Sequence, residues 1–160
     1  MLVRSVMTPR AETIGPDETL EHAASRMREL GLGALVVSDG EEPLGILTDR
    51  DIVVRSTAHG RNPAIADVRS AMTPQLISCR VDDDLETAVR RMEEGAVRRV
   101  VVLDEGSHVV GMLSVDDVAL RSAPLAGEIL EHVRAPERPV QRGTWSWWEE
   151  ALAEGPATPP

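Results

Sequence analysis

The sequence predicts an α/β (α+β) fold in which two tandem repeats, each strand–helix–strand–strand–helix, pack with pseudo-twofold symmetry ahead of a C-terminal tail. Internal similarity is the first observation: after a shift of 65 positions, 13 of the 33 residues from 7 to 39 are identical to their counterparts. The second is that both copies share a helical spacing of apolar residues. The third is a pair of short apolar runs in each copy without polar alternation, typical of strands buried on both faces.

Each copy opens with Met-Thr-Pro, at Met7–Pro9 and again at Met72–Pro74, and a helix is predicted after this segment. In the first copy Asp17 is the expected N-cap, apolar residues recur at helical spacing from Leu20 to Leu30, and Gly31 is the expected stop. The second copy repeats the same signals in Asp82, the span from Leu85 to Met92, and Gly95.

Two strands are predicted after each helix. They are Ala34–Val37 and Leu44–Leu47 in the first copy, Val100–Leu103 and Val109–Leu113 in the second. An acidic, glycine-bearing turn separates the strands of each pair, and a second short helix follows directly. Because neither half could cover its own apolar sheet, we expect the halves to pack face to face.

These boundaries predict a first repeat at 1–60, a second at 61–122 and a C-terminal extension at 123–160 with short helices and a disordered end. One of those helices is expected over Ala126–His132. In a second, Trp145, Trp148 and Leu152 would form one apolar stripe. That stripe would pack on its own module or a dimer mate, or the group Trp145, Trp147 and Trp148 would dock another protein.

Composition excludes several classes of function. The formal charge is −10 and all seventeen basic residues are arginine, so broad contacts with nucleic acid or an anionic membrane are not expected. No apolar run approaches membrane-spanning length, and the N-terminal residues lack the apolar stretch of a secretion signal. The lone Cys79 excludes an internal disulfide and a multi-cysteine zinc site. We therefore expect a cytoplasmic protein.

One motif occurs twice, as GILTDRDIVV from Gly45 and as GMLSVDDVAL from Gly111. Each places a hydroxyl residue at the end of a strand and an aspartate three residues later, in the pairs Thr48 with Asp51 and Ser114 with Asp117. Such a hydroxyl, beside a helix N-terminus, can donate to a phosphate oxygen, and a carboxylate can accept from both hydroxyls of a ribose. The alternative is that these residues only cap their helices.

The chain resembles a pair of CBS domains, the tandem called a Bateman module, and in particular the stand-alone actinobacterial CBS-pair proteins. The resemblance rests on VMTP at Val6–Pro9, AMTP at Ala71–Pro74, the helix–Val-Val–Asp segments and the two Gly-x-x-Thr/Ser-x-x-Asp motifs, and it covers about residues 1 to 122. It implies a ligand-sensing regulatory protein that binds an adenosine-containing nucleotide, such as AMP, ADP or ATP, between its repeats. It also implies a homodimer, since relatives pair two modules into a flat disc.

The resemblance also implies that the leading segment of one copy faces the hydroxyl–aspartate motif of the other. The predicted ligand-binding residues are Thr48, Asp51, Ser114, Asp117, Arg98, Arg99, Arg10, Ala11, Gln75, Leu76, Gly33 and Ala34. Relatives often place basic residues near phosphates where this chain has Arg98-Arg99, whereas its first copy has Gly33-Ala34, so the two sites are expected to be unequal. The alternative is that Arg98 and Arg99 are two surface arginines of an acidic protein and bind no ligand.

No catalytic constellation accompanies these motifs, and no enzymatic activity is expected. There is no phosphate-binding loop and no lysine, the histidines lack metal-ligand spacing, and Asp49, Asp51 and Asp116-Asp117 have no matching base, nucleophile or metal. The competing class is a structural or protein-interaction module without a physiological small ligand.

Overall fold

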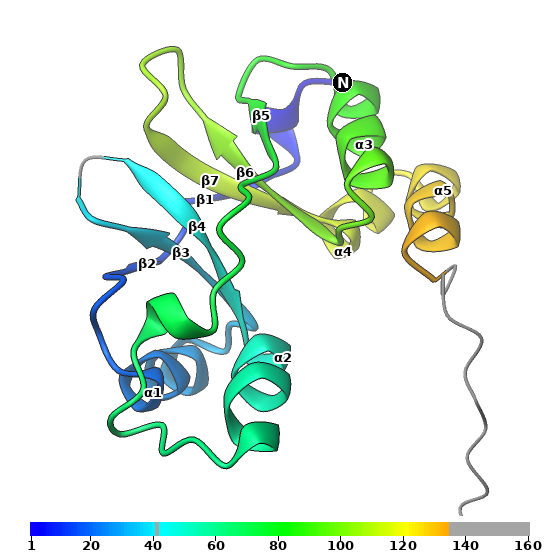
Figure 1. Cartoon of the computed structure of the whole chain (residues 1–160). Helices are drawn as coiled ribbons and strands as arrows, with labels where there is room; N and C mark the ends of the chain where they lie inside the picture. The colour runs from blue at the N-terminus through cyan, green and yellow to red at the C-terminus, as the bar shows by residue number, and fades with distance from the viewer. Residues whose placement is uncertain (41, 135–160) are drawn as a thin grey trace, which may run out of the picture.

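The structure of the protein, a computed structural model, describes residues 1–40 and 42–134. The predicted element order is confirmed in both repeats, and Figure 1 shows them as two lobes. The first repeat contains β2 (Thr13–Ile14), α1 (Leu20–Leu30), β3 (Ala34–Ser38), β4 (Pro43–Thr48) and α2 (Asp49–Asp51), which continues as a π-helix over Ile52–Ser56. The second contains β5 (Ser78–Arg80), α3 (Leu85–Glu94), β6 (Arg99–Leu103), β7 (Val109–Ser114) and α4 (Val115–Ala119).

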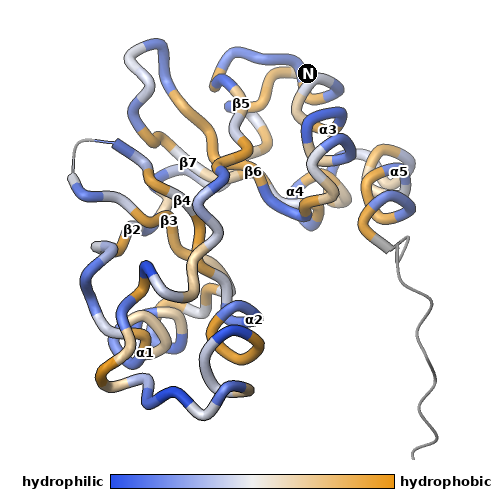
Figure 2. Tube along the Cα trace, in the orientation of Figure 1, coloured by the Kyte–Doolittle hydropathy of each residue, from blue (hydrophilic) through white to orange (hydrophobic). Residues whose placement is uncertain are grey.

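Short elements precede and follow these units: a 3-10 turn at Val3–Ser5, β1 (Thr8–Pro9), 3-10 turns at Thr57–His59 and Val68–Ser70, and α5 (Ala123–Arg134). One sheet has the order β2-β3-β4 and the other β1-β7-β6-β5. The first strand of each repeat, β2 or β5, is parallel to its neighbour, β3 or β6. The two long strands of each repeat, β3 with β4 and β6 with β7, form an antiparallel hairpin. Figure 2 shows the hydrophobic stretches of these hairpins meeting in the middle of the molecule.

The leading arm of each repeat joins the sheet of the other. The first arm, residues 1–12, contributes β1, which pairs antiparallel with β7 of the second repeat. The second arm, residues 66–77, contributes Thr73, which pairs with Ile46 of β4 through backbone hydrogen bonds of 3.0 and 2.8 Å. Each sheet is therefore completed by a strand or bridge from the other repeat.

The hydrophobic cores are exchanged in the same way. Val3 and Val6 of the first arm lie in the core of the second repeat, together with residues of α3, β6 and β7. Val68 and Ala71 of the second arm lie in the core of the first repeat and are 0% exposed. Packing thus crosses the sequence boundary expected at residue 60, and each core needs the arm of the other repeat.

Gly45 and Gly111 stand where the arms cross the sheets. A Cβ atom built on Gly45 would lie 2.3 Å from the carbonyl oxygen of Thr73, and one on Gly111 would lie 2.7 Å from that of Thr8. Both separations are shorter than real Cβ contacts, so only glycine lets the arm backbone approach this closely. This close approach explains the glycine that opens each copy of the repeated motif.

The predicted N-caps were wrong at both long helices. Thr19 caps α1 by accepting a hydrogen bond of 3.2 Å from the backbone N–H of His22, while Asp17 lies outside the cap. At α3 the cap position is occupied by Asp84, whose side chain makes no capping hydrogen bond, and not by Asp82. The true caps lie two residues nearer the helices than the sequence suggested.

The predicted helix stops are confirmed, because α1 ends at Gly31, with a φ of 66°, and α3 ends at Gly95. The helix expected over Ala126–His132 is also present and is longer, as α5, which packs on α3 and α4. The predicted stripe of Trp145, Trp148 and Leu152, and the docking group that includes Trp147, lie outside the described residues. In the part of the chain that the structure describes, no helix is long and apolar enough to cross a membrane.

Candidate functional site

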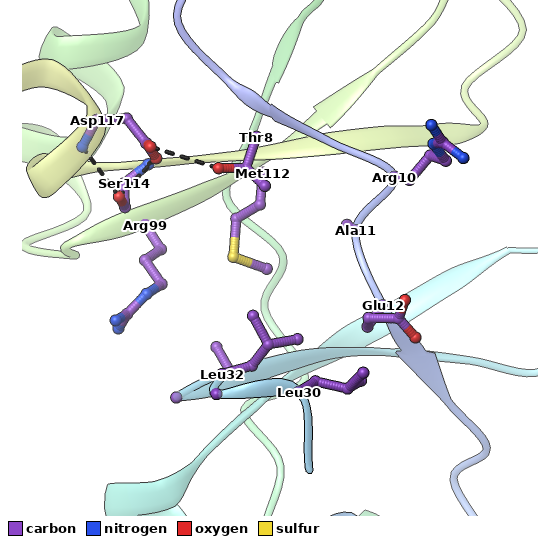
Figure 3. A pocket seen from close by; sticks show the side chains of 13 residues that line it. Thr8, Arg10, Ala11, Glu12, Leu30, Leu32, Arg99, Met112, Ser114 and Asp117 are labelled. Atoms are coloured by element: carbon purple, nitrogen blue, oxygen red, sulfur yellow. Dashed lines mark hydrogen bonds between the residues drawn. The ribbon is translucent and has the colours of Figure 1, made fainter. Parts of the chain in front are cut away.

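Two clefts lie where the repeats meet, and both contain residues predicted from the sequence. Cleft A has a volume of about 400 Å³, and cleft B about 580 Å³. Cleft A is lined by the predicted residues Arg10, Ala11, Gly33, Ala34, Arg99, Ser114 and Asp117 (Figure 3). Cleft B is lined by the predicted residues Thr48, Asp51, Gln75, Leu76, Arg98 and Arg99. All twelve predicted positions therefore lie in one cleft or the other.

Each cleft joins the hydroxyl–aspartate motif of one repeat to the arm of the other. In cleft A, Ser114 and Asp117 face Thr8, whose hydroxyl donates to Asp117 Oδ1 at 3.4 Å. In cleft B, Thr48 and Asp51 line the same cavity as residues of the second arm. The crossed arms thus bring together residues that lie far apart in the sequence.

The motif side chains also bond to each other as reciprocal helix caps. The Ser114 hydroxyl donates to Asp117 Oδ2 at 2.6 Å, the Ser114 backbone N–H donates to the same oxygen at 2.8 Å, and Asp117 N–H donates back to Ser114 Oγ at 3.2 Å. Thr48 and Asp51 repeat the arrangement at 2.7, 2.9 and 3.1 Å. The capping role considered from the sequence is therefore present in both clefts. Each motif hydroxyl donates its hydrogen bond to the aspartate of its own motif.

The second carboxylate oxygen of each aspartate is engaged less tightly. Asp117 Oδ1 has the 3.4 Å contact from Thr8, and Asp51 Oδ1 lies 3.4 Å from Arg55 Nη2. Both separations lie beyond the usual range for strong charge-assisted bonds. One oxygen per carboxylate is thus positioned to accept a hydrogen bond from a ligand hydroxyl.

Arg55 is a residue that the sequence reasoning missed. Its Nη1 donates to the carbonyl oxygens of Ala71 and Met72 and to the Thr73 hydroxyl, at 2.9 to 3.0 Å, while Nη2 faces Asp51. The guanidinium therefore ties the motif of cleft B to the second arm. The signal was present in the sequence, since Arg55 follows Asp51 by four residues on one helical face.

Three arginine side chains of the clefts have no partner in the part of the chain that the structure describes. Among the described residues, the side chains of Arg10, Arg98 and Arg99 make no hydrogen bond or ion pair, whereas Glu12 of cleft A is paired with Arg26. Arg98 is exposed and Arg99 is half-buried. In a chain of formal charge −10, these guanidinium groups are free to bind an anion.

The apolar walls of the clefts were not predicted. Leu32 and Met112 line cleft A, while Ile46, Ile77 and Val101 line cleft B. Met112 and Val101 are cross-strand partners, and they lie on the sheet face opposite the helices. The all-apolar run from Val100 to Leu103, which predicted a strand buried on both faces, was the sequence signal for this second apolar face.

Metal-ligating side chains and the lone thiol are the remaining candidate features. Within residues 1–40 and 42–134, no group of three or more His, Cys, Asp or Glu side chains could hold a metal ion. Cys79 lies in the core of the second repeat, and burial raises the pKa of its thiol to about 11, so the reactive thiolate is disfavoured.

Comparison with known proteins identifies relatives along most of the chain. The family model for the CBS domain matches residues 3–56 and 65–123. The chain is 33% identical over 133 residues to the CBS domain-containing protein YhcV of Bacillus subtilis, which covers 82% of this chain and 94% of YhcV. It is 34% identical over 117 residues to hypoxic response protein 1 of Mycobacterium tuberculosis, covering 72% and 81%. It spans 63% of the uncharacterized protein MK0525 of Methanopyrus kandleri, with 31% identity.

Solved structures of CBS-domain proteins superpose on most of the chain. The CBS domain protein TA0289 of Thermoplasma acidophilum superposes with a TM-score of 0.77 at 26% identity, over 84% of this chain and 77% of that one. PAE2072 of Pyrobaculum aerophilum, solved in complex with AMP, gives 0.70 at 19% identity, over 83% and 98%. The CBS domain pair of MJ0100, in complex with 5-methylthioadenosine and S-adenosyl-L-methionine, gives 0.65 at 21%, over 75% and 94%. At 19% and 21% identity, the similarity to PAE2072 and MJ0100 shows a shared fold alone.

Proposed function

This chain belongs to the CBS-domain family, as a pair of repeats, and on that premise we propose that it is a regulatory protein that binds an adenosine-containing nucleotide in clefts A and B. AMP, ADP and ATP are the first candidates. The ligand state would be passed to a partner through shape or assembly. We further propose that the protein acts in the cytoplasm as a homodimer and catalyses no reaction.

One observation carries the proposal: each cleft unites an acceptor carboxylate, guanidinium groups that no described residue pairs with, and an apolar wall, built from both repeats. The two volumes, about 400 and 580 Å³, fall in the range of small-molecule sites. The bound AMP of PAE2072 and the adenosyl ligands of MJ0100 supply the chemical class, because both proteins share this fold.

The chemistry of such a ligand matches the cleft walls. The more loosely engaged Oδ1 atoms of Asp51 and Asp117 can accept from ribose hydroxyls without breaking the caps, which use Oδ2. The guanidinium groups of Arg98 and Arg99 can form charge-assisted hydrogen bonds with phosphate. Leu32 with Met112, and Ile46 with Val101, offer apolar surfaces for a base. The motif hydroxyls would contact phosphate only after turning away from their aspartates.

The test is a thermal-shift screen followed by calorimetry with adenosine, AMP, ADP, ATP, S-adenosylmethionine, NAD and cyclic dinucleotides. We expect at least one adenosine compound to stabilise the protein. Replacing Arg98 and Arg99 together by alanine should weaken ATP and AMP much more than adenosine, by roughly tenfold or more, and should flatten the salt dependence. An equal loss for all three ligands would mean that these arginines support the fold.

A second candidate is a structural or interaction module without a physiological small ligand. The capping geometry favours it, because both motifs are already satisfied within the protein. No response to any compound in the screen would select this second function.

A further inference from the structure

Arg99 occupies a position that no other lining residue shares. Of the described residues around the two clefts, Arg99 alone lines both. It is the first residue of β6 and pairs in register with Ser114 of the cleft A motif. Its counterpart in the first repeat is Ala34, so the pseudo-symmetric position supplies no second guanidinium.

The guanidinium lies at the wall between the clefts. A Cβ atom built on Gly33, which lines cleft A, would lie 3.7 Å from Arg99 Nη2 and 3.4 Å from Oδ2 of Asp49, which lines cleft B. Figure 3 shows the Arg99 side chain extending past Ser114 toward the segment that carries Leu32. Because no described residue pairs with it, protein contacts do not commit this charge to either cleft.

We propose that Arg99 is a phosphate-binding residue shared by clefts A and B, so that two phosphorylated ligands compete for one guanidinium. This inference rests on the proposed function and adds a coupling between its two sites. A phosphate bound in one cleft draws the side chain to that side. The second cleft then binds its nucleotide without a charge-assisted hydrogen bond that it would have when alone. Adenosine has no phosphate, so its two binding events are independent.

Sharing is tested first, in variants that isolate the clefts. Asp51→Asn weakens cleft B and Asp117→Asn weakens cleft A, while the amide oxygen can still accept the capping bond. In both backgrounds, Arg99→Ala should weaken AMP by about tenfold or more and leave adenosine unchanged. Arg98→Ala, the matched control, should weaken AMP only where cleft B remains. If Arg99→Ala affects one cleft alone, the shared role is wrong.

Coupling is tested second, by calorimetry on the parent protein with AMP. Independent clefts would give the sum of the two single-cleft isotherms. A shared Arg99 should make the second step about tenfold weaker than that sum, and Arg99→Ala should restore additivity. A parent isotherm equal to the sum overturns the inference. So does a larger gap in Arg99→Ala, which would indicate direct repulsion between phosphates. Absence of any nucleotide binding by the parent would instead remove the proposed function itself.

Discussion

Replacing Gly45 by alanine tests the crossed-arm architecture directly. The new methyl group would lie 2.3 Å from the carbonyl oxygen of Thr73, in the backbone of the second arm. Backbone cannot rotate away as a flexible side chain can. The arm must therefore retreat by about 1 Å to reach an ordinary van der Waals separation.

The cost follows from what the retreat breaks. Ile46 and Thr73 exchange two backbone hydrogen bonds, of 3.0 and 2.8 Å, and a shift of that size takes both beyond bonding distance. Each is worth about 1 kcal/mol net, and overpacking of a filled site costs about 1–3 kcal/mol. Alanine recovers about 0.5–1 kcal/mol of chain entropy relative to glycine. We expect a net destabilisation of about 2–4.5 kcal/mol.

Urea unfolding followed by circular dichroism measures this difference. Gly127→Ala is the matched control, because Gly127 lies in α5 and no atom would come within 4 Å of its new Cβ. There the same substitution should stabilise the protein by about 1 kcal/mol. A Gly45→Ala protein within about 0.5 kcal/mol of the parent would refute the steric reasoning. Nucleotide affinity at cleft B should fall with stability, since Thr73 lines that cleft.

Three further predictions concern the ligand, the assembly and the thiol. Asp117→Ala and Asp51→Ala should each weaken the best nucleotide by roughly tenfold or more at their own cleft, and calorimetry showing parent-like affinity for both would contradict the assignment. Sedimentation equilibrium at micromolar concentration should give a homodimer, whereas a 17.4 kDa species with and without nucleotide would rule it out. The buried thiol of Cys79 should resist disulfide reagents until the protein unfolds. Because burial raises the thiol pKa from 9.0 to about 11, the unfolded chain loses this proton first and stability should fall between these pH values; Cys79→Ala should remove that slope.

The order of the elements was predictable because the chain contains the pattern twice, and each copy checks the other. The N-caps were not, and the reason is tertiary. The N–H of Leu20, at the start of α1, donates to the carbonyl of Ala66 at 2.9 Å, and that of Leu85, at the start of α3, donates to Met1 at 2.7 Å. In each helix a backbone carbonyl far away in the sequence thus satisfies the N–H of the first residue. Each helix therefore begins later than the predicted caps, Asp17 and Asp82, suggest.

The positions of the motif residues were predictable for a related reason, since Thr48 and Ser114 end β4 and β7 and the repeated spacing places an aspartate three residues after each. What their side chains do was not predictable in full. Whether Ser114 donates to phosphate or to Asp117 depends on a rotamer, and whether Arg99 serves one cleft or two depends on the wall that it crosses. The sequence pattern predicts where each residue lies on a strand or helix, but the partner of the Ser114 hydroxyl and the cleft that Arg99 reaches depend on side-chain rotamers.

The crossed arms give the molecule an attachment pattern that differs from its sequence order. Met1 is fastened to α3, and α5 packs on the same lobe, so the first and last described segments both belong to the second repeat (Figure 1). The first repeat is connected to that lobe by backbone at both of its ends, through the two arms. A load or tether applied at either of those segments is therefore carried by one lobe. The other lobe is linked to that one by the two arms, which also line the clefts.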